Sequence, residues 1–249
     1  MHARLRFLAI LVSTALLCIA ADLPTGDSLM QQAMQRSGTP EALAKVTSIV
    51  MTGRIVVEGR NIEGPVSVYQ QGNKNYTVIE FPGLGKVEEG YDGTVAWETN
   101  ALQGTRLKEG EEKAAAVRSS RMNLLASWRT EYKSARTLGE GDVDGKPAWK
   151  VELTPHEGKP ETFFFDKESG LPVRIAQTAV SPLGEIQVDL TLSDYRPVDG
   201  VQTPFVMTER AIGQVMTMRF AKIIYGSQIP PDRFELPAAV KALVAAKNK

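Results

Sequence analysis

The chain has 249 residues, a formal net charge of zero and 43% hydrophobic residues. That length suits one large β domain or two smaller ones, because all-β domains of roughly 200–250 residues are common. The balanced charge removes the electrostatic reason to expect nucleic acid as a partner.

Residues 1–21 are predicted to form a secretory signal peptide. Two arginines near the start precede an apolar run from Phe7 to Ile19. Small residues surround the junctions after Ala20 and Ala21, so we predict cleavage at one of these two positions. The protein is then exported, and we expect it in the periplasm.

Two other fates of this segment stay open from the sequence. The apolar run also fits an uncleaved anchor, although it is short for a span of about 20 residues. Cys18 also fits a lipidated cysteine, although Leu17 is bulky for the residue before one. Cys18 is the only cysteine, so cleavage leaves a mature chain, residues 22–249, without disulfides or thiol chemistry. We predict that this mature chain is a single domain.

Two short helices are predicted at the start of the mature chain. The segment from Asp27 to Ser37 places apolar residues on one face, with Asp27 or Ser28 as N-cap, and Gly38 ends it. Thr39 is placed to cap a second helix whose first residue is a proline.

From Thr47 the apolar residues alternate with a period of two. Short turns separate the alternating runs, so the segment to Thr99 predicts an antiparallel meander of about five strands. Asp92-Gly93 lies between two of them and predicts a type I′ hairpin turn, which needs positive φ at both central residues. Val95 and Trp97 would then share one face of the next strand.

The segment from Glu109 to Ser127 predicts a helix between strands. Glutamates open it, where a helix N-terminus favours negative charge, and residues of good helix propensity follow. Because this helix interrupts a series of strands, we expect it to lie across the sheet.

Strand patterns resume after Trp128 and continue to Phe220. With the first meander they give eleven or twelve strands, and Ala238 to Ala246 predicts a short C-terminal helix. So many antiparallel strands in one domain form a closed barrel, a sandwich or a strongly curved sheet wrapped on helices.

No stretch carries a convincing catalytic or metal-binding pattern. His156 is the only histidine left after cleavage, lies in a predicted turn and has no nucleophile-elbow sequence beside it. The segment from Asp142 to Gly145 is similar to the start of a calcium loop but lacks the further ligands, so it predicts a turn. We therefore expect a protein that is not an enzyme, with no cofactor and no metal site.

Three segments together resemble one protein family. They are Gly90–Trp97, Phe165–Arg174 and Ile229–Pro237, and their order and spacing cover most of the mature chain. They resemble the Asp-Gly hairpin, a strand-turn-strand and the closing segment of the LolA/LolB-like outer-membrane lipoprotein-sorting superfamily. The resemblance implies a mainly β (α+β) fold. Its single strongly curved antiparallel sheet would form an unclosed β-barrel of about eleven strands, covered by a few helices.

The resemblance also implies a function. In this family a hydrophobic cavity under the helices receives lipid acyl chains. The implied partners are lipid acyl chains or a lipoprotein, together with a membrane-bound donor or acceptor protein. Carriers of the LolA type have an Arg-Pro pair near the third strand that helps to hold the lid. The segment from Gly72 to Tyr76 lacks that pair, which bears on the transfer mechanism more than on the fold.

The expected cavity wall is the apolar side of the alternating strands, which a curved sheet of this kind makes concave. The predicted ligand-binding residues are Val66, Val68, Val95, Trp97, Phe163, Phe165, Ile186, Val188, Leu190, Met207, Met216 and Met218. Flexible methionine side chains suit a deformable apolar cavity, and ordinary core packing explains them equally well.

The leading hypothesis is an exported carrier or binder of lipid or lipidated protein, with outer-membrane lipoprotein sorting as the role that the family implies. An envelope sensor that uses the same fold to detect lipoproteins is the second hypothesis. A hydrolase with an unrecognised site, in which His156 would be the first residue to test, is the third.

Overall fold

The computed structural model describes residues 23–181, 184–247 and 249, so the predicted signal peptide and its cleavage site lie outside the described residues. Thirteen strands of the described chain form one sheet. In chain order they are β1 (Ser48–Val57), β2 (Ile62–Gln71), β3 (Lys74–Phe81), β4 (Gly85–Tyr91), β5 (Ala96–Asn100), β6 (Gly104–Lys108), β7 (Tyr132–Val143), β8 (Lys146–Pro155), β9 (Glu161–Asp166), β10 (Pro172–Ser181), β11 (Gly184–Val198), β12 (Val201–Ala211) and β13 (Gln214–Tyr225).

The helices are α1 (Gly26–Ser37), α2 (Pro40–Ala44), α3 (Gly110–Ser119), α4 (Leu124–Glu131), the short 3₁₀ helix η1 (Pro231–Phe234) and α5 (Ala238–Lys247). The predicted C-terminal helix is thus confirmed as α5. Over the described residues, no helix has the length and apolar character needed to cross a membrane.

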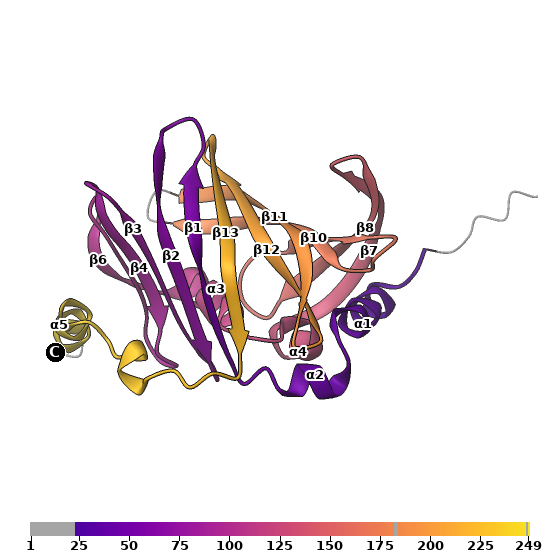
Figure 1. Ribbon diagram of the computed structural model, residues 1–249. Coiled ribbons are helices and arrows are strands. Elements are labelled where there is room, and N and C mark those ends of the chain that lie inside the picture. Colours follow the sequence, from indigo (N-terminus) through magenta and orange to yellow (C-terminus); the bar gives the residue numbers. More distant parts are fainter. Residues whose placement is uncertain (1–22, 182–183, 248) are drawn as a thin grey trace, which may run out of the picture.

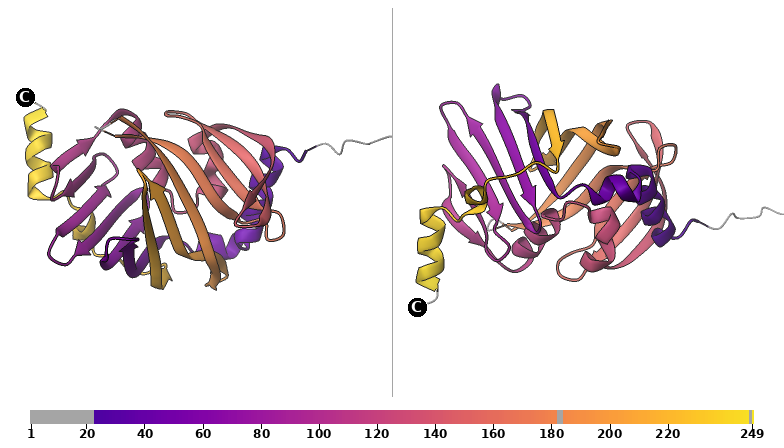
Figure 2. Two further views of the ribbon diagram at one scale, coloured as in Figure 1. Left: turned by 90° about the horizontal axis from the view of Figure 1, so that it is seen from above. Right: turned by 60° about the horizontal axis from the view of Figure 1, so that its bottom comes forward.

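The sheet is antiparallel and nearly follows the order of the chain. Its strand order is β6-β5-β4-β3-β2-β1-β13-β12-β11-β10-β9-β8-β7, so the pairing of β1 with β13 joins the two halves. Strands β6 and β7 are the two edges and do not pair with each other. The sheet curls strongly, with α3 on its concave side (Figure 1, Figure 2). This confirms the predicted unclosed barrel formed by one curved antiparallel sheet.

The strand that the alternation test missed is β6. Its residues Arg106 and Lys108 bind Glu98 at 2.8 Å and Glu89 at 2.7 Å on the concave side. Because charged side chains take the inward positions, β6 shows no apolar alternation. With β6, the described sheet has thirteen strands, against the eleven or twelve counted from the sequence and the about eleven that the resemblance implied.

Local sequence decides where the amino-terminal helices begin. Thr25, and not Asp27 or Ser28, caps α1, because its side-chain oxygen accepts from the Ser28 amide at 3.1 Å. Thr39 caps α2 immediately before Pro40, as predicted.

The helix predicted over Glu109–Ser127 is in fact two helices. The first, α3, ends at Ser119, and α4 begins after Asn123, whose side chain accepts from the Ala126 amide. Serine and asparagine favour helix caps over interiors, since their side chains compete for backbone hydrogen bonds. The break lets α3 lie against β4, β5 and β10 while α4 packs on α1 and β7.

The β4–β5 connection is a tight turn but not the predicted type I′ turn. Gly93 has a φ of 101°, whereas Asp92 has no positive φ. The Asp92 carboxylate instead accepts from the Thr94 and Val95 amides at 2.8 and 2.7 Å, which forms an Asx turn. Val95 consequently belongs to the loop and not to the strand.

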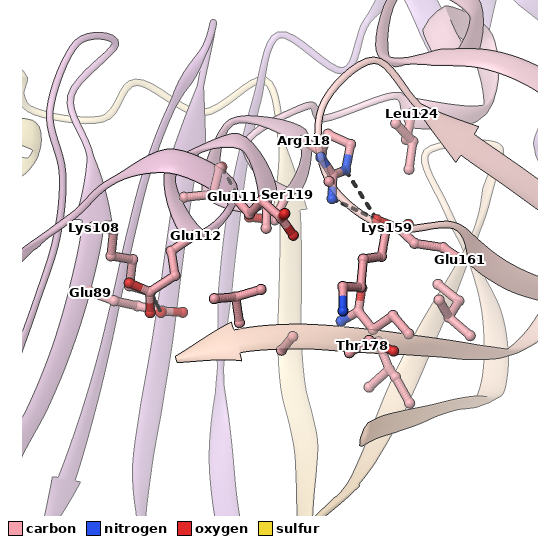
Figure 3. A pocket seen from close by; sticks show the side chains of 18 of the residues that line it. Glu89, Lys108, Glu111, Glu112, Arg118, Ser119, Leu124, Lys159, Glu161 and Thr178 are labelled. Carbon is pink, nitrogen blue, oxygen red and sulfur yellow. Dashed lines mark hydrogen bonds and ion pairs between the residues drawn. The ribbon is translucent and has the colours of Figure 1, made fainter. Parts of the chain in front are cut away.

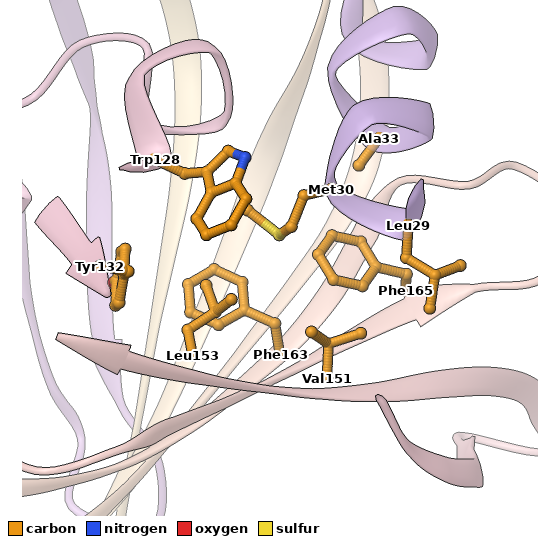
Figure 4. Close-up of a cluster of buried hydrophobic side chains, with 9 residues drawn as sticks. All are labelled: Leu29, Met30, Ala33, Trp128, Tyr132, Val151, Leu153, Phe163 and Phe165. Carbon is orange, nitrogen blue, oxygen red and sulfur yellow. The ribbon is translucent and has the colours of Figure 1, made fainter. Parts of the chain in front are cut away.

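One apolar core cluster fills the concave side at the β7–β9 end. Met30 of α1 and Trp128 of α4 pack with Leu153, Phe163 and Phe165 of the strands below them (Figure 4). The Phe163 and Phe165 rings stack with their centroids 6.2 Å apart. This end of the barrel is therefore closed by well-packed helices.

A second apolar cluster lies where β1 and β2 meet β12 and β13. Its buried members are Ile49, Val66, Phe205, Phe220 and Ile223. Met122, from the link between α3 and α4, packs against it from the concave side. The space between the two clusters is where α3 crosses the sheet.

The C-terminal segment covers part of the outer face of the sheet. Arg233 stacks on Tyr69, with 4.7 Å between the guanidinium carbon and the ring centroid, and η1 contacts β3. Tyr69, Tyr76 and Trp97 form a row of rings on that face, with successive centroids 6.2 and 6.1 Å apart. Farther on, α5 packs against the edge strand β6.

Candidate ligand-binding cavity

A cavity of about 360 Å³ lies between α3 and the concave face of the sheet (Figure 3). Strands β9, β10 and β11 supply one wall, and β4 and β6 supply residues at one end. Ligand pockets commonly enclose roughly 300–1,000 Å³, so this space can hold at least part of a small ligand.

Apolar side chains form the wall opposite α3. Ile175 pairs with Phe163 on one neighbouring strand and with Leu190 on the other, so the three side chains form a row on one face. Facing this row, α3 presents Ala115 and Ala116. Because alanines are small, they leave the space between helix and sheet unfilled.

One end of the cavity carries a network of paired charges. Lys108 binds Glu89 at 2.7 Å and lies 3.6 Å from Glu98. Arg106 donates to Glu98 at 2.8 Å and to both carboxylate oxygens of Glu112 at 2.7 Å. These contacts tie α3 to β5 and β6, and the five groups together carry a net negative charge.

The protonation of this network follows from its pairing. The Lys108 charge holds the pKa of Glu89 below its ordinary value, and Glu89 raises the pKa of Lys108 even though burial opposes this. Glu89 keeps 47% of its side-chain surface accessible, because that surface faces the open cavity. Glu209 of β12 makes no ion pair with a described residue. Burial, and then the negative charge of Glu89, raises the pKa of Glu209.

A second charged contact holds the C-terminal end of α3. Arg118 donates to one oxygen of Glu161 at 2.8 and 3.1 Å and to the Glu157 carbonyl at 2.8 Å. The other Glu161 oxygen accepts from the Tyr132 hydroxyl at 2.6 Å. The Arg118 and Glu161 side chains are only 12% and 8% exposed. Burial, and then the Glu161 charge, raises the pKa of Tyr132 above its ordinary value.

Helix α3 itself is loosely packed. It has no buried residue, and a second hollow of about 380 Å³ borders its other side, against Thr130, His156 and Glu157. The charged contacts of Arg106 and Arg118 therefore carry much of its attachment to the sheet. Elements with few buried apolar contacts open at a lower free energy than core elements.

Ten of the twelve predicted ligand-binding residues lie on the concave side, and two of these, Phe163 and Leu190, line the cavity. Phe165 belongs to the first core cluster. Val66, Val68, Met207 and Met218 lie in or against the second core cluster. Ile186, Val188 and Met216 lie on the same face by strand register but do not line the cavity.

The other two predicted residues lie elsewhere. Val95 is in the β4–β5 loop. Trp97 pairs with Gly90 and Tyr76 stacks against its ring, so it lies on the outer face near the C-terminal segment. The sequence pattern could not separate the two faces here, since apolar residues occupy the outer face as well.

The charged residues of the cavity were missed by sequence reasoning. They are Glu89, Lys108, Glu111, Glu112, Arg118, Lys159 and Glu161. One signal was present: Arg106 and Lys108 alternate on a strand opposite Glu98, and such cross-strand pairs favour opposite charges. Lys159, which extends from the β8–β9 loop into the cavity in Figure 3 and pairs with Glu185, had no local signal.

Two further features that the sequence analysis discussed can be placed. Asp144 and Gly145 have φ values of 52° and 80° and form the β7–β8 turn, which confirms the predicted turn. His156 follows β8, and its amide donates to the Glu131 carbonyl at 3.0 Å. Among the described residues, no three His, Cys, Asp or Glu side chains are grouped so as to hold a metal ion.

Comparison with solved structures identifies the fold. A DUF1329 family protein from Desulfovibrio piger superposes with a TM-score of 0.57 and 15% identity, over 86% of this chain and 98% of that one. A LolA superfamily protein from Nitrosomonas europaea gives 0.56 and 14%, over 86% and 99%. A Vibrio parahaemolyticus protein described as an outer membrane lipoprotein-sorting domain gives 0.54 and 11%, over 83% and 97%.

These similarities establish the fold of the chain as LolA-like, and they confirm the resemblance inferred from the sequence at that level. No protein-family model and no curated protein matches the sequence. At identities of 15% or less, the comparisons show the fold alone.

Proposed function

We propose that this protein is a periplasmic binder or carrier of lipid or lipidated protein and not an enzyme. The mature chain, residues 22–249, acts as one binding domain. One protein of the same fold is described as an outer membrane lipoprotein-sorting domain, and the proposal extends that type of cargo to this chain.

The observation that carries the proposal is the unfilled space between α3 and the row formed by Phe163, Ile175 and Leu190. A purely structural core packs such side chains to the density of an organic crystal. Here alanines of α3 face the row across a cavity of about 360 Å³. An acyl chain entering it gains about 0.8 kcal/mol per buried CH₂.

Helix α3 serves as the lid of this cavity. Its attachment through Arg106 and Arg118 is charged, and free space borders it on two sides. A bound chain longer than the present cavity displaces α3 outward, while α1 and α4 keep the β7–β9 end packed. These contacts take the place of the Arg-Pro pair that the segment from Gly72 to Tyr76 lacks.

The charged side chains that line the cavity suit the polar part of an amphipathic ligand. Lys159 and the Glu89–Lys108 pair border the same space as the apolar row. The acyl chain then lies on the row, and its polar group remains hydrated near these side chains. A ligand with both parts fits this lining better than a fully apolar hydrocarbon.

Mass spectrometry of organic extracts from natively purified protein tests the proposal. We expect acyl-chain lipid or a lipidated peptide in the extract, and we expect a fluorescent fatty acid to bind the delipidated protein. Absence of both would contradict the proposal. Amino-terminal sequencing of the exported protein should begin at Ala21 or Asp22, and a start at Met1 or a lipidated Cys18 would contradict the predicted processing.

A filling variant gives a direct control on the site. Ala116→Phe places a ring in the cavity and should weaken fatty-acid binding several-fold, because the space is no longer available. Ala114→Phe places the same ring toward the second hollow on the other side of α3 and should leave binding unchanged. Equal effects of the two substitutions would mean that the cavity is not the site.

A further inference from the structure

One end of the sheet gathers exposed apolar side chains at its hairpin tips. The β3–β4, β5–β6 and β12–β13 connections lie at the same end of their strands, since consecutive strands here are antiparallel neighbours (Figure 1). Leu84, Leu102 and Ile212 occupy these three connections and are 56%, 97% and 69% exposed. We call this set of three the apolar rim.

The apolar rim differs from the opposite end of the same strands. There the β2–β3, β4–β5 and β11–β12 connections contain Gly72-Asn73, Asp92-Gly93 and Asp199-Gly200, the polar residues that tight turns favour. No large exposed hydrophobic residue lies in these three connections. The contrast within one sheet shows that turn geometry does not require leucine or isoleucine at a tip.

Of the three side chains, Ile212 departs most from the residues that tight turns favour. It has a φ of 51°, in the left-handed region that a β-branched residue adopts only under strain. Isoleucine there lowers the stability of the fold and exposes apolar surface to water as well. Strain at an exposed site is a reason to look for a function that needs this side chain.

The spacing of the three tips favours a fluid partner over a folded one. From the strand order, Ile212 lies roughly 20 Å along the sheet from Leu84, and Leu84 roughly 10 Å from Leu102, at about 4.8 Å per strand. Three separate points do not form the contiguous face of about 800 Å² per partner that a stable protein interface needs. They can each enter a lipid layer independently.

The charges near the tips fit the same partner. Residues 82–85, 101–104 and 211–214 contain no charged side chain, so entry of the tips into an apolar layer desolvates no charge. Behind the β3–β4 tip, Lys86 and Glu80 neutralise each other at 2.9 Å. Between Ile212 and Leu84, the β1–β2 connection presents the exposed Glu58 and Arg60, so it carries no net charge and suits a zwitterionic lipid surface.

We propose that the apolar rim docks this protein on the surface of a lipid bilayer, with Leu84, Leu102 and Ile212 inserted among the lipids. Single exposed apolar residues are common on protein surfaces, but these three share one end of the sheet and one of them, Ile212, is strained. Once inserted, their contribution to docking grows with the apolar area that they bury. The docking does not depend on a ligand in the cavity, so it extends the proposed function and can fail or succeed separately from it.

Co-sedimentation of the mature protein with phosphatidylethanolamine–phosphatidylcholine vesicles tests the proposal. We expect the wild type to bind. The triple variant Leu84→Ser, Leu102→Ser, Ile212→Asn should bind at least about tenfold more weakly, because the inserted apolar area is gone. Fatty-acid binding in solution should be the same for both proteins.

The matched control is Leu138→Ser, which removes another exposed leucine (40%) from the edge strand β7 and should leave vesicle binding unchanged. Ile212→Asn alone should weaken vesicle binding while raising the melting temperature, a combination that a purely structural role for Ile212 would not give. The proposal is overturned if the wild type does not bind vesicles, which would leave the rim to a protein partner. It is also overturned if the triple variant binds like the wild type, or if Leu138→Ser weakens binding as much.

Discussion

Asp199 and Ile212 lie in the hairpin turns at the two ends of strand β12, and the two turns have the same backbone conformation. Asp199-Gly200 has φ values of 47° and 83°, and Ile212-Gly213 has 51° and 68°. Both are two-residue hairpin turns with positive φ at each central position, as type I′ turns require. Aspartate is suited to the first position, whereas isoleucine crowds its Cβ branches against the backbone.

This pair predicts the stability of two reciprocal variants. Ile212→Asn should raise the free energy of unfolding by about 1 kcal/mol, since asparagine tolerates the left-handed region. Asp199→Ile should lower it by a similar amount. Urea unfolding of both variants measures this. A lower stability for Ile212→Asn would show that the isoleucine contributes packing that its exposure does not suggest.

Gly93 predicts a second backbone effect. Its φ of 101° is unsuited to a side chain, and an added Cβ would lie 3.3 Å from the Asn73 amide. Gly93→Val should therefore destabilise the protein by more than about 1 kcal/mol. Thr94→Val, at the exposed neighbouring position without a positive φ, is the control and should change stability little. A melt of Gly93→Val that matches wild type would contradict the strain.

The sequence predicted the fold well where one face of a strand carries the apolar residues. The β8 to β13 alternation, the N-cap of α2 at Thr39 and the turn at Gly145 all follow from local patterns. It failed at β6, where Arg106 and Lys108 point inward, and at Trp97, where the C-terminal segment makes the outer face apolar as well. Both failures have one cause: which face is covered depends on segments distant in the chain.

The candidate site was harder to predict than the fold. Phe163 and Leu190 were found because they alternate on strands, but nothing local distinguishes them from Phe165, which lies in the packed core. The distinction comes from the helix above each residue. Large side chains of α1 and α4 fill the space over Phe165, and small ones of α3 leave it open over Leu190.

Tyr132 predicts how stability changes at high pH. Its pKa is raised in the folded state, first by burial and then by Glu161, above the ordinary value of about 10 that holds in the unfolded chain. Below about pH 10 neither state ionises, so this tyrosine costs no stability there. Above it the unfolded state loses its proton first, and the free energy of unfolding falls as pH rises.

Removing the hydroxyl tests this sign. Between about pH 8 and pH 11, Tyr132→Phe should lose less stability than the wild type in urea unfolding, because one raised pKa is gone. Tyr76 and Tyr195 also have raised pKa values, so part of the decline should remain. An equally steep decline in Tyr132→Phe would contradict the assignment to this residue.

The Arg118–Glu161 pair predicts the mobility of α3. The double variant Arg118→Met, Glu161→Gln removes the ion pair without leaving a lone buried charge, and glutamine can still accept from Tyr132. We expect amide hydrogen exchange in residues 110–119 to accelerate by about tenfold or more, which corresponds to about 1.4 kcal/mol. Exchange in α1, whose residues lie in the core, should not change. Unchanged exchange in α3 would mean that other contacts hold the lid.

Leu190 and Leu153 separate a ligand cavity from an ordinary core. Both are leucines on the concave side of the sheet, but Leu190 lines the cavity and Leu153 is fully buried in the first core cluster. A glutamine at position 190 can keep its amide hydrated in the open space, and unlike a glutamate it adds no charge opposite Glu209. Leu190→Gln should therefore melt near the wild type and bind a fluorescent fatty acid several-fold more weakly.

Position 153 has no open space beside it, so water cannot hydrate the amide of Leu153→Gln. Burying an unpaired amide there, together with the lost apolar contacts, should lower the free energy of unfolding by about 2–5 kcal/mol. Thermal melts and fatty-acid titrations of the two variants compare the environments directly. If Leu190→Gln unfolds the protein as Leu153→Gln does, the space beside Leu190 is closed to water in solution. A carrier that must admit an acyl chain at that wall is then excluded, because the wall would be packed core.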